Sequence, residues 1–148
     1  MKGKKVIWVD EDERIWASER WLLEGLGLAV IAVSDATSAL KLVREARLNE
    51  IALIILDVML LPGDDETTFS DTITDGGLKT GLVLGQLLAR EHADIGQKLL
   101  FFSRVTDEIG TAEIMRISKE LGAYYLQKSP KTQGRYFVKW LRNEGILT

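Results

Sequence analysis

Residues 53–66 read LIILDVMLLPGDDE, and a single aspartate, Asp57, interrupts the apolar run that opens this stretch. A short apolar run such as Leu53 to Leu56 indicates a strand that is buried on both faces of a parallel sheet. Because an unpaired buried carboxylate is costly, we expect Asp57 at an edge of the sheet, paired with a cation or bound to a ligand.

Similar apolar runs alternate with stretches of helical spacing along the rest of the chain. The predicted strands are residues 6–9, 28–33, 51–56, 99–102 and 123–126. The predicted helices lie at about 15–26, 36–43, 78–93 and 108–121 and around 137–141. Five strands that alternate with five helices predict an α/β fold, a doubly wound five-stranded parallel sheet covered on both faces.

The composition is that of a globular protein, with 46 % hydrophobic and 28 % charged residues among 148. Without a linker or a break in composition, residues 1–148 are expected to form a single domain. The absence of cysteine excludes disulfides, thiolate catalysis and cysteine-based zinc sites. The net charge of −3 argues against nonspecific nucleic-acid binding by the whole molecule.

The sequence gives no sign of secretion or of membrane insertion. The apolar run after the first lysines is too short for a signal-peptide core, and no run is long enough to span a bilayer. We therefore expect a cytoplasmic protein. Because the chain ends just after the last predicted helix, we also expect no attached DNA-binding or enzymatic domain.

The segment of residues 60–76 is too long and too polar for a routine connection between a strand and a helix. We interpret it as an inserted acidic loop between the third strand and the third helix. An EF-hand count from Asp71 places Ile73 and Leu82 at positions that require oxygen ligands, which excludes that calcium site. The loop contains no basic residue and five acidic ones, Asp64, Asp65, Glu66, Asp71 and Asp75.

Polar residues follow four of the predicted strands. Asp10 and Glu11 follow the first, Asp57 the third, Ser103 the fourth and Lys128 the fifth. Sites in open α/β sheets form beyond these carboxyl ends. Carboxylates from two strands suit Mg²⁺. A carboxylate beside Mg²⁺ is able to attack a phosphoryl group. The oxygens of that group then need hydrogen-bond donors, such as an ammonium and a hydroxyl. Asp57 is thus predicted to be a phosphoryl acceptor.

This pattern resembles the receiver domain of two-component response regulators, which has a flavodoxin-like (β/α)₅ fold. The resemblance covers nearly the whole chain except the inserted loop. It lies in four stretches that occur in order at predicted strand ends, VIWVDEDE (6–13), LIILDVMLLPG (53–63), LLFFSR (99–104) and AYYLQKSP (123–130). Each motif is weak by itself, whereas the four together are specific.

The resemblance implies a magnesium-dependent phosphoacceptor site. Glu11 would bind Mg²⁺ directly and Asp10 through water. Asp57 would be both the phosphoacceptor and a metal ligand, and Met59 would contribute its backbone carbonyl. Such a domain accepts a phosphoryl group and is not an enzyme that turns over a separate substrate.

The resemblance also implies a switch. Ser103 would move toward the phosphoryl group together with Lys128, and Tyr125 would change its rotamer. Two departures from the family pattern bear on this site. Arg104 stands where the family usually has a small residue, so it is expected to control access to Asp57, and Pro130 lies one residue later than usual.

The implied partners are a histidine kinase or phosphotransfer protein as donor and an unknown downstream protein. Homodimerisation would use the face of the fourth predicted helix, the fifth strand and the fifth helix. The last segment of the chain is basic, and helical spacing places much of its charge on one face. The basic residues are Lys131, Arg135, Lys139 and Arg142. The acidic loop is complementary in charge to this face. No nucleic-acid module is recognisable.

Two other functions stay open at this point. A binding module with the same fold but without phosphorylation is favoured by Arg104, by the shifted proline and by the inserted loop. A phosphatase of the haloacid dehalogenase type would use the D-x-D spacing of Asp10 and Asp12. Against it, Arg14 stands where that family has a small or hydroxylated residue, and no acidic pair follows Lys128.

Overall fold

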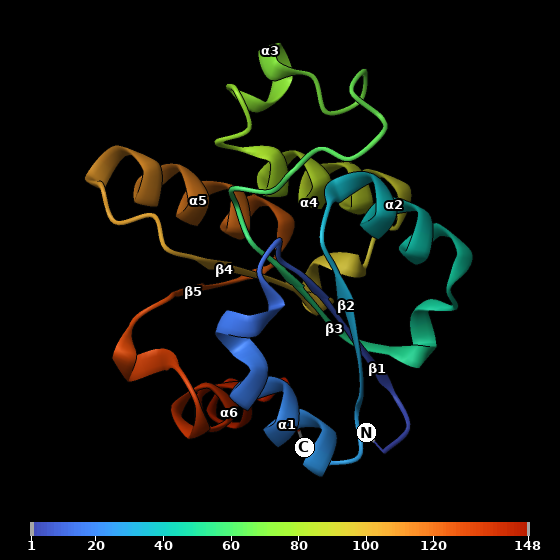
Figure 1. The fold of residues 1–148 in the computed structure, drawn as a ribbon, viewed down its shortest axis with the longest axis vertical. Helices are drawn as coiled ribbons and strands as arrows, with labels where there is room; N and C mark the ends of the chain where they lie inside the picture. The colour runs from blue at the N-terminus through green and yellow to red at the C-terminus, as the bar shows by residue number, and fades with distance from the viewer. Residues whose placement is uncertain (1, 148) are drawn as a thin grey trace.

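The computed structural model describes residues 2–147, and a five-stranded parallel sheet lies at its centre (Figure 1). The strand order is β2-β1-β3-β4-β5, which is the flavodoxin-like order. The predicted doubly wound sheet is therefore confirmed. The strands are β1 (Lys5–Val9), β2 (Ala29–Val33), β3 (Ile51–Leu56), β4 (Leu99–Ser103) and β5 (Tyr124–Gln127).

The predicted helices are present with ends shifted by a few residues, and the first begins as a 3-10 turn, η1 (Glu13–Trp16). One further helical turn, α3, lies within residues 60–76. Among residues 2–147, no helix is both long and apolar enough to cross a membrane. The helices are α1 (Ala17–Gly25), α2 (Ala36–Glu45), α3 (Asp71–Thr74), α4 (Thr80–Glu91), α5 (Glu108–Leu121) and α6 (Arg135–Asn143).

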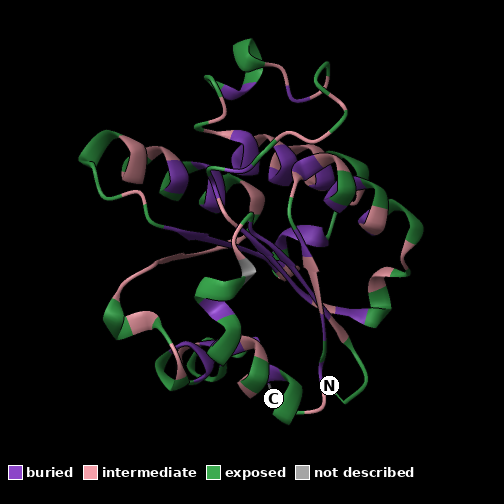
Figure 2. Ribbon diagram, viewed as in Figure 1, coloured by how far each residue is buried: buried purple, intermediate pink, exposed green. Residues whose placement is uncertain are grey.

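The helices cover the sheet in two layers, with α2, α4 and α5 on one face and α1 and α6 on the other (Figure 1). Side chains of a strand alternate between these faces. In β1, Ile7 and Val9 pack beneath the first layer, whereas Val6 and Trp8 pack beneath the second, and all four are fully buried (Figure 2). Trp8 stacks on Trp16 with ring centroids 4.1 Å apart.

Local capping signals fix where the helices begin and end. The side chain of Asp35 accepts a hydrogen bond from the backbone N–H of Ser38 at 2.7 Å, which starts α2 as a carboxylate N-cap does. Gly122 ends α5 in the left-handed conformation, with φ of 67°. Aspartate is a preferred residue at the N-cap and glycine at the position after a helix, so both caps follow from local residue type.

The segment between β3 and α4, residues 57–79, is held against the body of the protein, and we call it the β3–α4 connection. The side chain of Phe69 is inserted into the core and is 2 % exposed. The hydroxyl of Thr37 in α2 donates to the carbonyl of Pro62 at 2.5 Å and accepts from the backbone N–H of Asp65 at 3.0 Å. These contacts fix the path of the connection past the start of α2.

Helix α4 begins very close to the end of β3 because it carries a glycine at the point of contact. The N–H of Gly81 donates to the carbonyl of Val58 at 2.8 Å. A Cβ atom built on Gly81 would lie 1.8 Å from the carbonyl oxygen of Asp57. Any larger residue would push α4 away from the backbone of Asp57.

We predict that Gly81→Ala destabilises the protein by roughly 1–3 kcal/mol, the usual cost of overpacking a close contact. Urea unfolding monitored by tryptophan fluorescence measures this change.

Gly25→Ala is the matched control, because a Cβ built on Gly25 at the end of α1 meets nothing within 4 Å. It should leave stability unchanged or raise it by up to about 1 kcal/mol. Equal stability of the Gly81→Ala and Gly25→Ala variants would contradict the proposed close approach.

Candidate functional site

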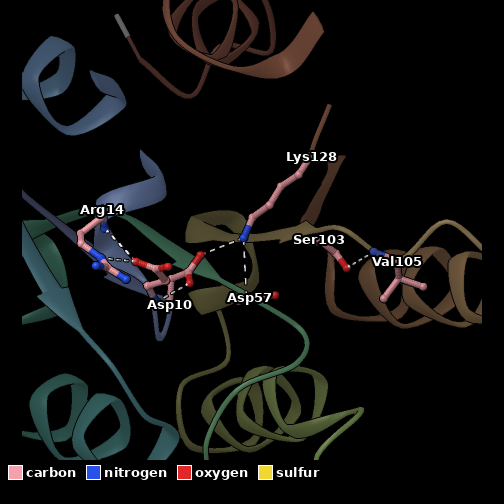
Figure 3. A network of polar contacts seen from close by, with 7 residues as sticks. Asp10, Arg14, Asp57, Ser103, Val105 and Lys128 are labelled. Atoms are coloured by element: carbon pink, nitrogen blue, oxygen red, sulfur yellow. Dashed lines mark hydrogen bonds and ion pairs between the residues drawn. The ribbon is translucent and has the colours of Figure 1, made fainter. Parts of the chain in front are cut away.

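Two aspartates lie side by side at the carboxyl edge of the sheet, because they follow the neighbouring parallel strands β1 and β3 (Figure 3). The N–H of Asp10 donates to the carbonyl of Val33 at 2.9 Å, and the N–H of Asp57 donates to the carbonyl of Val9 at 3.0 Å. Each aspartate thus continues the hydrogen bonding of its strand by one residue. This fixes both backbones before the side chains leave the sheet.

Lys128, which follows β5, places its ammonium between these carboxylates (Figure 3). Its Nζ lies 2.8 Å from Oδ2 of Asp10 and 3.6 Å from Oδ2 of Asp57. The side chains of Lys128 and Asp10 are 7 % and 5 % exposed, and that of Asp57 is 14 % exposed. Of these two carboxylates, that of Asp57 is therefore the more exposed to solvent.

The backbone and an aromatic ring hold Lys128 in this position. Its N–H donates to the carbonyl of Ser103 at 2.7 Å, which ties the end of β5 to the end of β4. Its ammonium also lies 5.4 Å from the ring centroid of Phe102, within cation–π range. The lysine is thus positioned by contacts that do not depend on the aspartates.

Burial raises the pKa of Asp57 above its ordinary value, because desolvation disfavours the charged form. The ammonium of Lys128 opposes this shift, whereas the nearby charge of Asp10 adds to it. Backbone N–H groups of Met59 and Val58 lower the pKa by smaller amounts. One ammonium thus lies beside two carboxylates and does not balance the charge of both.

An open cavity of about 500 Å³ lies in front of Asp57. Glu11 and Arg104 are both exposed and line this cavity. Asp12 accepts hydrogen bonds at 3.2 Å from the N–H and from Nε of Arg14, and the side-chain bond is the main reason why its pKa is lowered. The side chain of Arg14 is therefore directed to Asp12.

The two predicted switch residues lie outside the Asp10–Lys128–Asp57 contacts. Ser103 is buried, and its hydroxyl accepts a hydrogen bond from the N–H of Val105 at 3.0 Å (Figure 3). Tyr125 is half-buried against the core under α5, and its hydroxyl is buried without a hydrogen-bond partner among residues 2–147. The structure thus gives Ser103 a direct link to the loop after β4, and gives Tyr125 an unpaired hydroxyl.

The donor atoms of the site fit Mg²⁺. Mg²⁺ typically takes one or two carboxylates and keeps several waters, and Asp10 and Asp57 supply two carboxylates with only one shared ammonium. Burial raises the pKa of Asp57, and the neighbouring charge of Asp10 adds to this shift, so a further cation at this place would favour the charged carboxylate. In the described part of the chain, no group of three or more His, Cys, Asp or Glu side chains has metal-binding geometry.

Two residues of the site were not found from the sequence. Gly81 allows α4 to approach the backbone of Asp57, and Val105 donates to Ser103. The sequence does contain a signal for Gly81, because Gly81 and Gly85 lie four residues apart and so share one face of a helix. The structure shows that Gly85 is also a point of close contact, since a Cβ on it would meet the ring of Phe101 at 2.5 Å. No residue type predicts the contact of Val105, because a backbone N–H makes it.

We predict that Asp57→Asn stabilises the protein near neutral pH. Below the ordinary aspartate pKa of 3.8, Asp57 is protonated in both states, so the variant and the wild type should be similar. As the pH rises, the unfolded state releases its proton first, because the folded pKa is raised, and the wild type loses stability that the variant retains. Urea unfolding across this pH range measures the difference.

Asp65→Asn is the control of opposite sign. A hydrogen bond from the hydroxyl of Thr68 lowers the pKa of Asp65, so its carboxylate favours the fold above the ordinary pKa and loses that effect as the pH falls. The Asp65→Asn variant should therefore be the less stable one near neutral pH. The same pH profile for both variants would contradict the assigned cause of the Asp57 shift.

No family model matches the chain, and no curated protein matches it. Solved structures do match. A CheY-like response regulator receiver domain protein from Methanospirillum hungatei JF-1 aligns over 95 % of this chain and 92 % of its own, with a TM-score of 0.67 and 18 % identity.

Two other solved structures are similar over nearly their whole length. The response regulator TrrA from Thermotoga maritima, solved in complex with Mg²⁺–BeF, covers 97 % of this chain and 99 % of its own at 17 % identity, with a TM-score of 0.65. The non-phosphorylated HemR receiver domain from Leptospira biflexa covers 98 % and 96 % at 20 % identity, with a TM-score of 0.64. The chain therefore has the CheY-like receiver fold of response regulators.

Proposed function

We propose that the chain is a phosphoacceptor receiver domain that takes a phosphoryl group on Asp57 from a histidine kinase or a phosphotransfer protein. The observation that supports this most directly is the position of Asp57. Its carboxylate lies at the carboxyl edge of the sheet, faces an open cavity, and has the ammonium of Lys128 at 3.6 Å.

The chemical step is a phosphoryl transfer from a nitrogen to an oxygen. A carboxylate oxygen of Asp57 forms a bond to phosphorus as the bond between phosphorus and the imidazole nitrogen of the donor breaks, and the electron pair of that bond stays on the imidazole. The ammonium of Lys128 lies where it would balance the charge of the phosphoryl oxygens. Asp57 must be ionised to react, so its raised pKa favours the reaction at neutral rather than acidic pH.

Asp10, Glu11 and Asp57 would hold Mg²⁺ together with the backbone carbonyl of Met59. When bound, the ion supplies positive charge that offsets the repulsion between the carboxylates and the incoming phosphoryl group. The exposed side chain of Glu11 is free to turn into the cavity that it lines. Its extra methylene, relative to aspartate, gives it the reach to do so from an exposed position.

Ser103 and Tyr125 would transmit the change. The hydroxyl of Ser103 now accepts from the N–H of Val105, and it is free to donate its own proton to a phosphoryl oxygen on Asp57. A movement of Ser103 toward Asp57 would break its bond to Val105 and displace the start of the loop that leads into α5. Tyr125 would follow into the space that Ser103 leaves.

The downstream partner is an unknown protein, and residues 60–76 are an insertion within a single receiver domain of residues 1–148. Homodimerisation would use the face formed by α5, β5 and α6, which are the predicted fourth helix, fifth strand and fifth helix. Exposed basic side chains of α6, those of Arg135, Lys139 and Arg142, support a role of this face in charged contacts.

A binding module that is never phosphorylated is the second candidate. The observation that favours it is the closer approach of Lys128 to Asp10, at 2.8 Å, than to Asp57. The buried pair of Lys128 and Asp10 would then be a purely structural ion pair. The phosphatase alternative has weaker support, because this contact and the one between Arg14 and Asp12 occupy both acids of its D-x-D motif.

We predict that incubation with Mg²⁺ and acetyl phosphate or phosphoramidate adds one phosphoryl group to the wild type. Intact-protein mass spectrometry measures the gain, which should disappear without Mg²⁺ and in the Asp57→Asn variant. If small donors fail, a purified phosphotransfer protein replaces them as donor.

No gain with either class of donor would favour the unphosphorylated binding module. Turnover of a phosphate ester that Asp10→Asn abolishes, with Asp57→Asn harmless, would instead favour the phosphatase.

Arg104 is predicted to slow the reaction of small phosphodonors, because its side chain lines the cavity in front of Asp57. Arg104→Ala should raise the initial rate of phosphorylation by acetyl phosphate severalfold, as followed by mass spectrometry over time. Arg14→Ala is the matched control, since Arg14 lines the same cavity but is bonded to Asp12. An unchanged rate in Arg104→Ala would count against this access role, and a lower rate would show that Arg104 assists the donor instead.

A further inference from the structure

A groove is lined by residues at the start of α4, at the start of α5 and in the β3–α4 connection. It has a volume of about 280 Å³, and we call it the α4–α5 groove. Its apolar lining includes Met59, Leu78, Leu82, Val105, Ile109 and Ile114. This groove does not include Asp10, Asp57 or Lys128.

Three of the apolar side chains at the groove are exposed to solvent. Ile109 is 83 % exposed, Leu78 55 % and Met59 40 %. Single exposed apolar residues are ordinary, but three that line one groove form a patch of the kind that marks a binding surface. The methionine among them is flexible and adapts well to the apolar face of a partner.

The polar part of the groove is acidic. Asp75, Asp107 and Glu113 line it, and Lys79 is the one cation among the described residues that line it. Lys79 is already paired with Glu113, with 3.0 Å between Nζ and Oε2. The remaining carboxylates therefore leave a net negative charge around the apolar floor.

We propose that the α4–α5 groove binds an amphipathic helix of a partner protein, with apolar residues on one face and lysine or arginine beside them. The apolar floor matches the helix-in-groove mode of recognition, and the charge of Asp75 and Asp107 selects a basic rather than an acidic helix. The basic helix α6 of a second copy is a less suitable occupant. It lies at the opposite end of the molecule, so pairing through it would be head-to-tail and would give a ring or a filament and not a symmetric dimer.

The walls of the groove touch the candidate phosphorylation site. Val105 lines the groove, and its N–H donates to the hydroxyl of Ser103. Met59 also lines the groove, and its backbone N–H lowers the pKa of Asp57. If Asp57 is phosphorylated, as proposed above, the groove would change shape with Ser103 and Val105, and helix binding would change with it. This coupling rests on the proposed function, whereas the docking itself does not.

The test selects peptides from a phage-displayed random library on the wild type, with the Leu78→Ser/Ile109→Ser double variant as counter-selection. Both side chains are exposed, so the double variant should fold, and circular dichroism checks this. Enriched peptides should share apolar residues at helical spacing and carry lysine or arginine. A synthetic copy should bind the double variant at least about tenfold more weakly, because two buried contacts are lost.

Trp21→Ser is the matched control, since Trp21 is 74 % exposed on α1 and far from the groove, and it should bind the peptide like the wild type. No enrichment over the double variant, or enrichment of acidic peptides, would overturn the proposal. Self-association of the wild type in sedimentation, absent from the double variant, would assign the groove to a second copy instead.

Adding a phosphodonor and Mg²⁺ to the binding assay distinguishes a failure of this proposal from a failure of the proposed function. Peptide affinity should change on their addition in the wild type and not in Asp57→Asn. Peptide binding that meets the criteria above, with no mass gain after addition of the donor, would retain the groove and count against phosphorylation. Unchanged peptide affinity in protein that has gained the phosphoryl group would count against the coupling alone. Phosphorylation without any selected peptide would retain the proposed function and reject the groove.

Discussion

The ammonium of Lys128 lies between the buried carboxylates of Asp10 and Asp57, and the polar edge of the sheet depends on this shared contact. Loss of the ammonium would leave both carboxylates without a cation, and a buried charge without compensation costs about 3–5 kcal/mol. One cation does not fully balance two anions, however, and burial raises the pKa of Asp57. The structure thus keeps a partly exposed carboxylate whose charge is incompletely neutralised, and the proposed metal binding and phosphoryl transfer rest on this feature.

The topology of the sheet brings these groups together. In the order β2-β1-β3-β4-β5, β1 and β3 are neighbours, so the residues that follow them meet at one edge. The N–H of Lys128 donates to the carbonyl of Ser103, which holds the ends of β5 and β4 in register with that edge. Gly81 then lets α4 approach the backbone of Asp57. Each of these steps fixes the backbone from which a side chain of the site extends.

The β3–α4 connection adds a second kind of surface beside this site. Phe69 and Thr37 fix its path, and its last residues leave Leu78 exposed next to Ile109 of α5. The apolar surface and the acidic rim are therefore held by the same contacts that close the loop onto the core. Through Met59 and Val105, this surface shares its walls with the residues that contact Asp57 and Ser103.

Alternating apolar runs and caps such as Asp35 were sufficient to predict the strands, the main helices and the fold class, because these signals are local. Polar residues at strand ends also predicted which groups share one edge, since parallel strands leave them there. The 2.8 Å contact between Lys128 and Asp10, which are 118 residues apart, was decided by the tertiary structure alone. The insertion of Phe69 into the core and the formation of the α4–α5 groove were also decided by the tertiary structure alone, because packing between distant segments leaves no periodic signal in the sequence.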